Sequence, residues 1–478
     1  MIAEVTKTIE INPVSRIEGH GKVTIQLDNS GNVVDAKFNI TQFRGFEKFC
    51  EGRVFWEMPV ITPRICGICP VSHHLAAAKA CDEILGVELT RPATLLRELL
   101  HMGQTLQSHA LHFFYLASPD LLLGMDADPA TRNVVGLITE KPDLAIRGIR
   151  LRSLGQTIIQ KLGGKKVHPN CAVPGGMNTA LSQADRDRFL KEIGRAIADA
   201  QAAIAIIKSY YDTNSDLLST YATFPTGYLG LVDAHNNLEL YDGKLRLIDR
   251  KGEVLEDQFE PSDYLNIIAE HVEDWSYLKF PFYKRMGYPD GIYRAGPLAR
   301  LNVSQGTSTP LANAELKNFK KLGNNGIVEG SLYYHYARLI ELLYSIERIQ
   351  QLLEDRDICS TDLIVTSRRY NEQGVGVVEA PRGTLFHHYW VDETGKISKV
   401  NLIVATGHNN AAMNKAVYQV ARTYIKNGKL NEGVLNRVEA AIRCYDPCLS
   451  CSTHALARMS LNIQLIAPDG QIVQEVTG

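Results

Sequence analysis

Arg64-Ile-Cys66-Gly-Ile-Cys69-Pro-Val-Ser-His73-His74 near the start of the chain is matched near its end by Asp446-Pro-Cys448-Leu-Ser-Cys451-Ser-Thr-His454. Each stretch holds a Cys-x-x-Cys motif, whose spacer lets both sulfurs face one metal ion. Four thiolates form a soft site that suits zinc, an iron–sulfur cluster or another thiophilic transition metal. Cys69 and Cys448 lie 379 positions apart, whereas a zinc ribbon joins its pairs over about 15–20 residues. The sequence therefore predicts a metal at the centre of a large fold.

The composition is that of an ordinary globular protein. The chain has 478 residues, of which 45% are hydrophobic and 22% charged, and its formal net charge is −2. This near-neutral charge gives no reason to expect nucleic acid or an anionic membrane as a partner. Nine cysteines, an odd number in a long chain, favour a reducing compartment over a disulfide framework. Because neither a signal peptide nor an apolar run of roughly 18–20 residues is visible, we expect a cytoplasmic protein without a membrane span.

Helical periodicity dominates the middle of the chain, and extended segments flank it. Helices are expected at 70–86, 92–117, 143–162, 183–222 and 329–354. Strands are expected at 5–11, 22–28, 33–40, 375–390 and 398–406, and hairpins at 237–249, around Asp242-Gly243, and at 461–474, over Pro468-Asp-Gly470. No Pro-, Gly- or Ser-rich boundary divides the chain. The predicted fold is mostly α with peripheral β: one large domain with a long central helical bundle and short sheets or hairpins at its edges.

Some charged and histidine-bearing positions outside the cysteine motifs are candidates for a site. One of His73 and His74 could hydrogen-bond a sulfur or a ligand, while the other is a structural histidine. Two other charged stretches are more often solvated turns than parts of a site: Arg16-Ile-Glu18-Gly-His20 and Arg44-Gly-Phe-Glu47-Lys48. Arg382 stands between Pro381 and Gly383, and a guanidinium on so rigid a loop is a better clamp for an anion or ligand than most arginines, although a surface salt bridge is the default.

Standard nucleotide-binding loops are missing from the sequence. No Gly-x-Gly-x-x-Gly opens a helix after a strand, and Gly163-Gly-Lys165-Lys166 lacks the Walker spacing. We therefore expect neither a dinucleotide nor ATP to bind this chain through such a loop.

Taken together, the motifs resemble the large subunit of [NiFe]-hydrogenases. The resemblance runs along the whole chain through the two cysteine motifs, Asn12-Pro-Val-Ser-Arg16-Ile-Glu18-Gly-His20, Phe43-Arg-Gly-Phe-Glu47, Gln107-Ser-His109 to Pro119-Asp120, Glu379-Ala-Pro-Arg382-Gly and Ala405-Thr-Gly-His-Asn409-Asn410. Other stretches are most similar to the cytoplasmic bidirectional, NAD-linked branch, among them Glu47-Lys-Phe-Cys-Glu-Gly-Arg53 and Gly296-Pro-Leu-Ala-Arg-Leu-Asn-Val303.

The resemblance implies a role for each matching residue. Cys66 and Cys448 would be terminal ligands of nickel, and Cys69 and Cys451 would bridge nickel to an iron that carries CO and cyanide. Glu18 matches the family's first proton carrier, and Arg382 the arginine over the open site. The groups that orient the ligands and this arginine would be Asp120, Pro381 and Asp446. A buried Mg²⁺ site would be formed by Glu47, the carbonyl near Ile403, and His454.

Partners and maturation also follow from the resemblance. The chain has no cysteine set left for an Fe–S cluster, so electrons would leave through a small Fe–S subunit to diaphorase subunits that bind flavin and NAD. Residues 1–454 would be the single mature domain, and 455–478 an extension that a maturation endopeptidase removes after nickel-insertion factors have loaded the metal. The hypothesis is an enzyme subunit that cleaves and forms H₂.

Two alternatives remain beside this hypothesis. One is a hydrogenase coupled to a deazaflavin or another carrier. The other is a non-catalytic four-cysteine zinc protein or a complex-I-like structural subunit, although complex-I-like relatives have lost the metal ligands that this chain keeps. The sequence does not indicate the physiological direction, the oxygen tolerance or the redox carrier.

Overall fold

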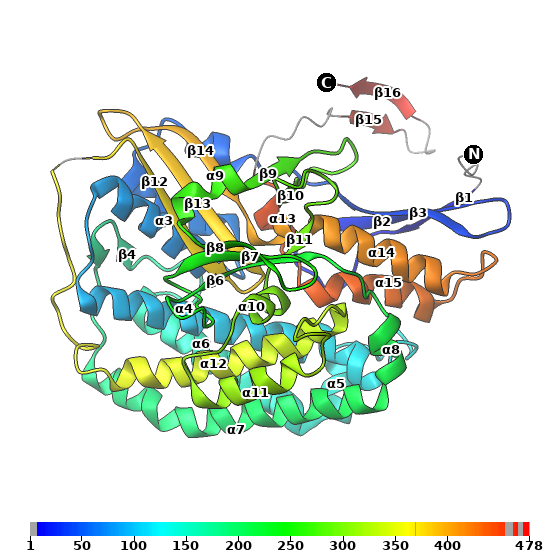
Figure 1. Cartoon of the computed structure of the whole chain (residues 1–478), viewed down its shortest axis with the longest axis horizontal. Coiled ribbons are helices and arrows are strands. Elements are labelled where there is room, and N and C mark those ends of the chain that lie inside the picture. The colour runs from blue at the N-terminus through cyan, green and yellow to red at the C-terminus, as the bar shows by residue number, and fades with distance from the viewer. Residues whose placement is uncertain (1–6, 369, 455–461, 467–471, 478) are drawn as a thin grey trace.

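A layer of long helices supports the β-sheets of the molecule, which lie on its opposite side (Figure 1). The computed structural model describes residues 7–368 and 370–454 and, for their backbone alone, residues 462–466 and 472–477. The helices of this layer are α4 (Arg91–Leu111), α6 (Pro142–Gly163), α7 (Gln183–Thr213), α11 (Pro310–Lys320) and α12 (Tyr334–Glu354). Their first turns follow local rules, since the Thr90 hydroxyl accepts from the Ala93 N–H and the Ser182 hydroxyl from the Asp185 N–H.

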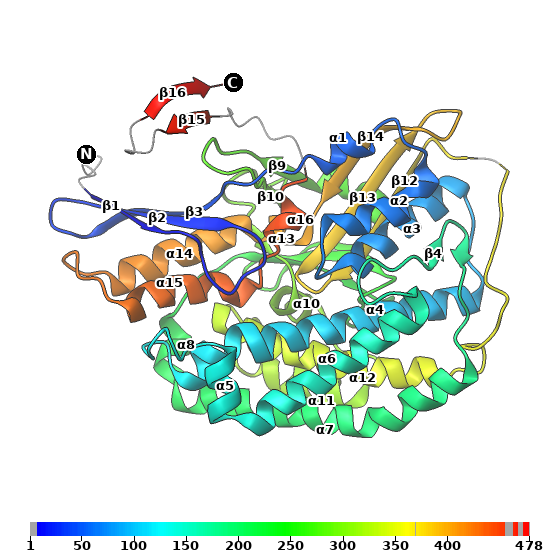
Figure 2. The same ribbon diagram turned by 180° about the vertical axis from the view of Figure 1, so that it is seen from behind.

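Helix α4 lies at the centre of the helical layer and is buried along nearly its whole length. It packs between α6 and α12 (Figure 2). Glycine permits its close contact with α6: a Cβ on Gly155 would lie 2.5 Å from the Gly103 carbonyl oxygen. The predicted central bundle is thus confirmed, and it supports the elements that carry the cysteines.

Two antiparallel three-stranded sheets flank the cysteine motifs. The first has the order β1 (Lys7–Ile11), β2 (Gly21–Leu27), β3 (Val33–Ile40), as predicted, and α14 (Asn410–Tyr424) packs against β3. The second has the order β12 (Gln373–Ala380), β13 (Gly383–Val391), β14 (Ile397–Ile403). Helix α3 (Pro70–Leu85) lies directly on β12, so closely that a Cβ on Gly376 would clash with the Ala76 carbonyl oxygen.

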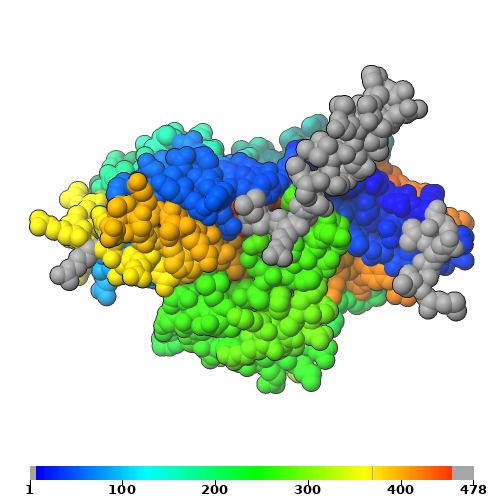
Figure 3. All heavy atoms as spheres, turned by 90° about the horizontal axis from the view of Figure 1, so that it is seen from above, coloured from blue at the N-terminus to red at the C-terminus, as the bar shows by residue number. Residues whose placement is uncertain are grey.

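A third sheet lies beside the second and has the order β11 (Tyr293–Arg294), β6 (Gly227–Val232), β7 (Lys244–Ile248), β8 (Val254–Phe259). The segment that contains it, coloured green, gathers on one side of the molecule (Figure 3). The remaining α-helices and strands are α1 (Phe46–Cys50), α2 (Met58–Ile61), α5 (Val134–Glu140), α8 (Ser215–Thr220), α9 (Tyr264–Ile267), α10 (Pro297–Val303), α13 (Ala405–His408), α15 (Glu432–Tyr445), α16 (Leu449–Ser452), β4 (Ala172–Val173), β5 (Gly176–Met177), β9 (Ile268–His271), β10 (Phe280–Tyr283), β15 (Asn462–Ile466) and β16 (Ile472–Thr477).

The expected elements differ from the observed ones at four places. The strand region 375–390 is a hairpin, because Pro381 and Arg382 form a two-residue turn between β12 and β13. The helix expected at 183–222 is interrupted at Asn214, and the one at 92–117 ends its α-helical part at Leu111 and continues as a π-helix, His112–Ala117. The prediction of a hairpin within 237–249 is wrong, since β7 pairs with β6 and β8.

The C-terminal hairpin is present as two paired strands. Strand β15 pairs antiparallel with β16, and the predicted turn at 468–470 lies outside the described residues. In the part of the chain that the structure describes, no helix has both the length and the apolar character needed to cross a membrane.

Candidate metal centre

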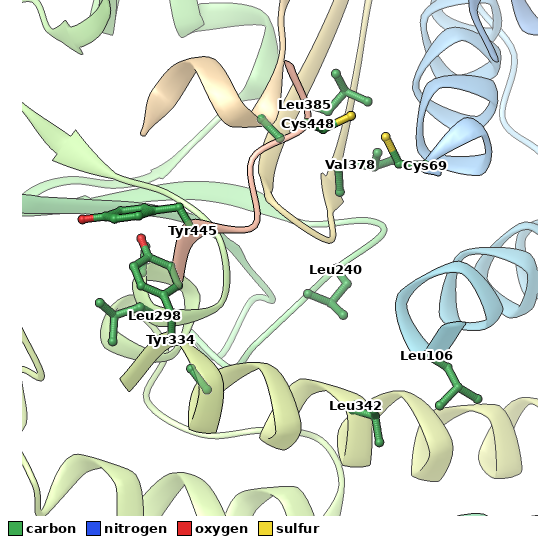
Figure 4. Packing of buried hydrophobic residues seen from close by; sticks show 14 of the residues in the cluster. Cys69, Leu106, Leu240, Leu298, Tyr334, Leu342, Val378, Leu385, Tyr445 and Cys448 are labelled. Carbon is green, nitrogen blue, oxygen red and sulfur yellow. The ribbon is translucent and has the colours of Figure 1, made fainter. Parts of the chain in front are cut away.

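The two cysteine motifs meet in the interior, as predicted. Cys69 directly precedes α3, whose first residue is Pro70, and Cys448 directly precedes α16. The sulfur of Cys66 lies 3.3 Å from that of Cys448, the sulfur of Cys69 lies 3.4 Å from that of Cys451, and 2.9 Å separates Cys448 from Cys451. All four sulfurs lie within 4.8 Å of one another and are buried. Figure 4 shows Cys69 and Cys448 reaching the same space from opposite sides.

The donor set suits a thiophilic metal cation. All four thiols are free, and their separations exceed the roughly 2.05 Å of a disulfide bond. Burial raises the pKa of the Cys448 and Cys451 thiols well above the ordinary value, and four thiolates confined to one small space repel one another. A thiophilic transition metal removes both costs, because it binds the deprotonated sulfurs directly. Within the described residues, this is the one group of three or more Cys, His, Asp and Glu side chains arranged to hold a metal ion.

A small cavity opens beside the sulfurs. It measures about 10 Å³ and is lined by Cys69, His73, Ala380, Arg382, Leu385, Val404, Ala405, Thr406, Cys448 and Cys451. A structural zinc site is closed by its four ligands, whereas a catalytic metal keeps one position open. The cavity therefore leaves room for a coordination position beyond the four sulfurs, as a catalytic metal needs.

Arg382 forms one wall of this cavity. Its side chain is 2% exposed, and Nη2 donates to the Asp446 carboxylate over 3.1 Å. Nη1 points to the Ser108 hydroxyl at 3.4 Å. The short turn between β12 and β13 places this cation, and Asp446, which has a left-handed φ of 53° at the end of α15, supplies its counter-ion.

Glu18 connects a cysteine sulfur with the molecular surface. Cys448 Sγ donates to Glu18 Oε2 over 3.0 Å, and the Ser450 N–H donates to the same oxygen over 3.1 Å. The Leu449 N–H donates to the Glu18 carbonyl, so the segment around Glu18 runs beside the second cysteine motif. The residue is half-buried, which leaves one end of it near solvent.

Asp120 and Pro381 lie in different surroundings. The Asp120 carboxylate bonds with Arg16, with Arg443 at 2.8 Å and with Asn436 at 3.0 Å. Among the described residues, no hydrogen bond or ion pair joins Asp120 to Arg382 or to a cysteine of the two motifs. Pro381 lies in the turn directly before Arg382. Ser108, which the sequence analysis did not assign to the site, lies 3.4 Å from Arg382 Nη1.

Glu47 and His454, which the resemblance assigns to one Mg²⁺ site, lie side by side, with His454 buried and Glu47 partly buried. His454 Nε2 lies 3.7 Å from Glu47 Oε1 and 2.5 Å from the Leu402 carbonyl oxygen. The Leu402 N–H donates to Glu47 over 2.7 Å. The carbonyl beside the two side chains is therefore that of Leu402, one residue before Ile403. Burial raises the pKa of Glu47 to about 7, so a cation here would relieve an unfavourable carboxylate.

The two adjacent histidines have separate tasks. His73 lines the metal cavity and hydrogen-bonds with His387 at 3.0 Å. His74 bonds with the Pro59 carbonyl and accepts the Ala172 N–H, which is a structural role. Arg44 also has a definite place, since its Nη1 donates to the Ile65 carbonyl over 2.6 Å, directly beside Cys66.

The fold and the site define a metalloenzyme subunit with one buried four-thiolate centre. A family model described as nickel-dependent hydrogenase matches residues 44–136 and 240–454, and another described as HoxL-like matches residues 8–43. The chain belongs to the [NiFe]-hydrogenase large-subunit family, and it is the catalytic subunit of an oxidoreductase that acts on H₂.

Several relatives and solved structures cover almost the whole chain. The beta subunit of the NAD-reducing hydrogenase HoxS of Cupriavidus necator is 44% identical over 98% of this chain and 99% of its own. A subunit of the F420-non-reducing hydrogenase of Methanothermobacter thermautotrophicus is 42% identical with the same two coverages. A solved NAD⁺-reducing [NiFe]-hydrogenase in the H₂-reduced state is 47% identical with a TM-score of 0.92, over 94% of this chain and 100% of that chain.

Proposed function

We propose that Cys66, Cys69, Cys448 and Cys451 hold a nickel–iron centre at which H₂ is cleaved and formed heterolytically. Cys66 and Cys448 would be the terminal ligands of nickel, and Cys69 and Cys451 the bridges to an iron that carries CO and cyanide. The observation that carries the proposal is the set of four buried sulfurs within 4.8 Å beside a cavity. When bound, the centre supplies Lewis-acid activation of H₂.

The side chains around the centre would handle the charge and the proton. Glu18, 3.0 Å from the Cys448 sulfur, accepts the proton and passes it toward solvent. Arg382 places a fixed positive charge over the cavity, and Asp446 and Ser108 orient its guanidinium. Asp120 bonds with Arg16 and Arg443, which supports a role in holding the Arg16–Glu18 segment rather than Arg382.

Infrared spectroscopy of the purified complex tests the metal assignment. We expect absorption bands in the CO and cyanide stretching region, together with nickel and magnesium in about equal amounts by metal analysis and iron in excess, because the Fe–S clusters of the partner subunit add iron. A complex purified after growth without nickel is the control for nickel content, and any CO and cyanide bands that it keeps report the iron alone. A zinc-only protein without these bands would contradict the proposal, and it would favour the non-catalytic alternative.

We propose that a small Fe–S subunit receives the electrons at the first cysteine motif. Arg64 and Gly67, on either side of buried Cys66, are exposed. Val60 is 40% exposed and Val167 42% exposed, so apolar side chains are available at the surface for a partner. Flavin- and NAD-binding diaphorase subunits would follow, as the name of the C. necator relative suggests, and such an assembly would work in the cytoplasm.

The isolated chain should therefore reduce no NAD with H₂, whereas the whole complex should do so. The measurement is NADH absorbance under H₂, with the complex as the positive control. The relatives named F420-non-reducing, at 42% identity, support a different carrier as the second candidate. A complex that reduces an artificial dye but not NAD would favour that candidate, and NAD reduction by the chain alone would overturn the partner assignment.

Glu47, the Leu402 carbonyl and His454 would hold Mg²⁺. A carboxylate and a carbonyl are ligands that this hard cation accepts, and the histidine completes the set. Lys279 and Glu270 line the adjacent small cavity beside His454 and could bond to metal-bound water. The site would fasten the C-terminal end of the mature domain, because His454 is three residues from Cys451.

The segment 455–478 would be removed during maturation, leaving residues 1–454 as the single domain. The family match ends at residue 454, and His454 is 4% exposed. The uncut chain already buries His454 and brings the four sulfurs together, so an endopeptidase that cuts after His454, once nickel-insertion factors have loaded the centre, would fix this arrangement rather than create it.

Intact-mass measurement decides this maturation step. Protein matured in its host should end at His454, whereas protein made without nickel should retain Gly478. The nickel-free preparation is the control for unspecific proteolysis. A fully active, nickel-loaded enzyme that still ends at Gly478 would contradict the processing step while leaving the metal assignment intact.

A further inference from the structure

The turn that carries Arg382 is held by donors from three distant elements. Ala380 pairs with Gly383, so only Pro381 and Arg382 lie between the strands. Each of the four successive carbonyls from Glu379 to Arg382 accepts a hydrogen bond from a buried side chain. The donors, in chain order of the carbonyls, are His101 at 2.9 Å, Arg300 at 2.9 Å, Arg300 again at 3.3 Å, and Asn409 at 3.3 Å.

Arg300 supplies the two central bonds and uses its guanidinium completely. Its side chain has no exposed surface. Nε and Nη2 each donate to Glu341 over 2.6 Å, and Nη1 donates to Glu379 over 2.7 Å. With the carbonyls of Ala380 and Pro381, these bonds use all five N–H groups that a guanidinium carries. A lysine, with three N–H groups on one nitrogen, cannot reproduce this pattern.

The side chain of Arg382 is held more loosely than its backbone. Its nitrogens donate to Asp446 at 3.1 Å and toward Ser108 at 3.4 Å. Among the described residues Nε has no hydrogen-bond partner. The place of this guanidinium over the cavity therefore depends on the backbone from which the side chain extends, and Arg300 donates to the two central carbonyls of that backbone.

We propose that Arg300, oriented by Glu341, is a positioning residue for H₂ cleavage that sets where the Arg382 guanidinium lies beside the metal centre. This inference rests on the role proposed for Arg382. It distinguishes Arg300 from a buried ion pair that only stabilises the fold, because two of its five bonds end on the turn itself. A displacement of about 1 Å in a reacting site can slow turnover about 100-fold, and loss of the fork permits such a displacement.

The test is Arg300→Lys, with Arg97→Lys as the matched control. Arg97 is also fully buried and donates to a carboxylate, Asp82, and to two carbonyls, those of Val173 and Gly176, but it holds a different loop. Hydrogen–deuterium exchange in the nickel-free chain should rise at the backbone amides of 380–385 in Arg300→Lys alone. In the loaded complex, the same variant should shift the infrared bands and lower turnover about 100-fold.

Unchanged exchange at 380–385, or equal changes in both variants, would overturn the inference. If Arg300→Lys fails to fold, Glu341→Gln loosens the same guanidinium by removing one carboxylate acceptor, and faster exchange of the turn is again expected. If Arg382→Lys turned over H₂ at the parent rate, the role of Arg382 would fail, while the exchange result would still report whether Arg300 holds the turn.

Discussion

Replacing Glu18 with glutamine should slow H₂ turnover by about 100- to 10,000-fold, the usual range for losing a positioned acid–base group. The Cys448 sulfur and the Glu18 oxygen are 3.0 Å apart, which is proton-transfer distance. Glutamine keeps the size and can still accept from the Ser450 N–H, so the second cysteine motif should keep its shape. It cannot take up a proton, and the reaction therefore loses its first acceptor.

The measurement is the rate of H₂ uptake together with D₂–water exchange, which does not depend on the electron acceptor. Both rates should fall in Glu18→Gln, while nickel and iron contents stay at the parent level. Glu10→Gln is the matched control, because Glu10 lies on β1 in an exposed ion pair with Lys22 and contacts no cysteine. Parent-level exchange in Glu18→Gln would mean that the proton leaves by another group.

The group of four cysteines was predictable from the sequence because the chemistry of metal ligands depends on residue type and spacing. Thiolates at a two-residue spacing have few other uses in a reducing compartment, and the fold brings both pairs together as expected. Long helices were predictable for a similar reason, since their periodicity extends over many residues. Glycine positions such as Gly376 gave no such signal, because what approaches them is decided by tertiary packing.

The details that the sequence analysis did not predict lie at positions where a single residue determines the geometry. Successive carbonyls of a strand point in opposite directions, so the sequence alone could not choose between Leu402 and Ile403. The sequence assigned Asp446 and Asp120 together to the groups that orient the ligands and Arg382; Asp446 pairs with Arg382, whereas Asp120 pairs with Arg16 and Arg443, and Ser108 on α4 is the second residue that faces Arg382. The β12–β13 turn was hidden because both strands are buried and lack polar alternation.

The pairing of β7 shows a different difficulty. The turn residues Asp242 and Gly243 suggested a local hairpin, but they precede a strand whose partners are β6 and β8. Turn chemistry indicates that the chain bends and does not identify the strand that it meets. Long-range pairing of this kind depends on how the apolar face of each strand is covered.

Replacing Arg382 with lysine should lower H₂ turnover by about 100- to 1,000-fold, as when a preorganised donor is removed from a reacting site. Lysine keeps a positive charge but loses the planar fork, so it cannot hold Asp446 and Ser108 at once while facing the cavity. Asp446 is buried beside Arg382, and a charge left without its geometric partner there is unfavourable. Nickel and iron should remain, because no thiolate contacts are altered.

Turnover per nickel is the quantity that separates this role from a structural one. Arg348→Lys is the matched control, since Arg348 makes a two-bond ion pair with Glu98 on α4 and does not line the metal cavity. It should lose some thermal stability and keep its turnover per nickel. Parent turnover in Arg382→Lys would assign the open site to the metals and Glu18 alone. A loss of turnover in Arg382→Lys alone would instead show that the activation of H₂ depends on one fixed guanidinium. The β12–β13 turn positions this guanidinium, and Asp446 at the end of α15 is its counter-ion.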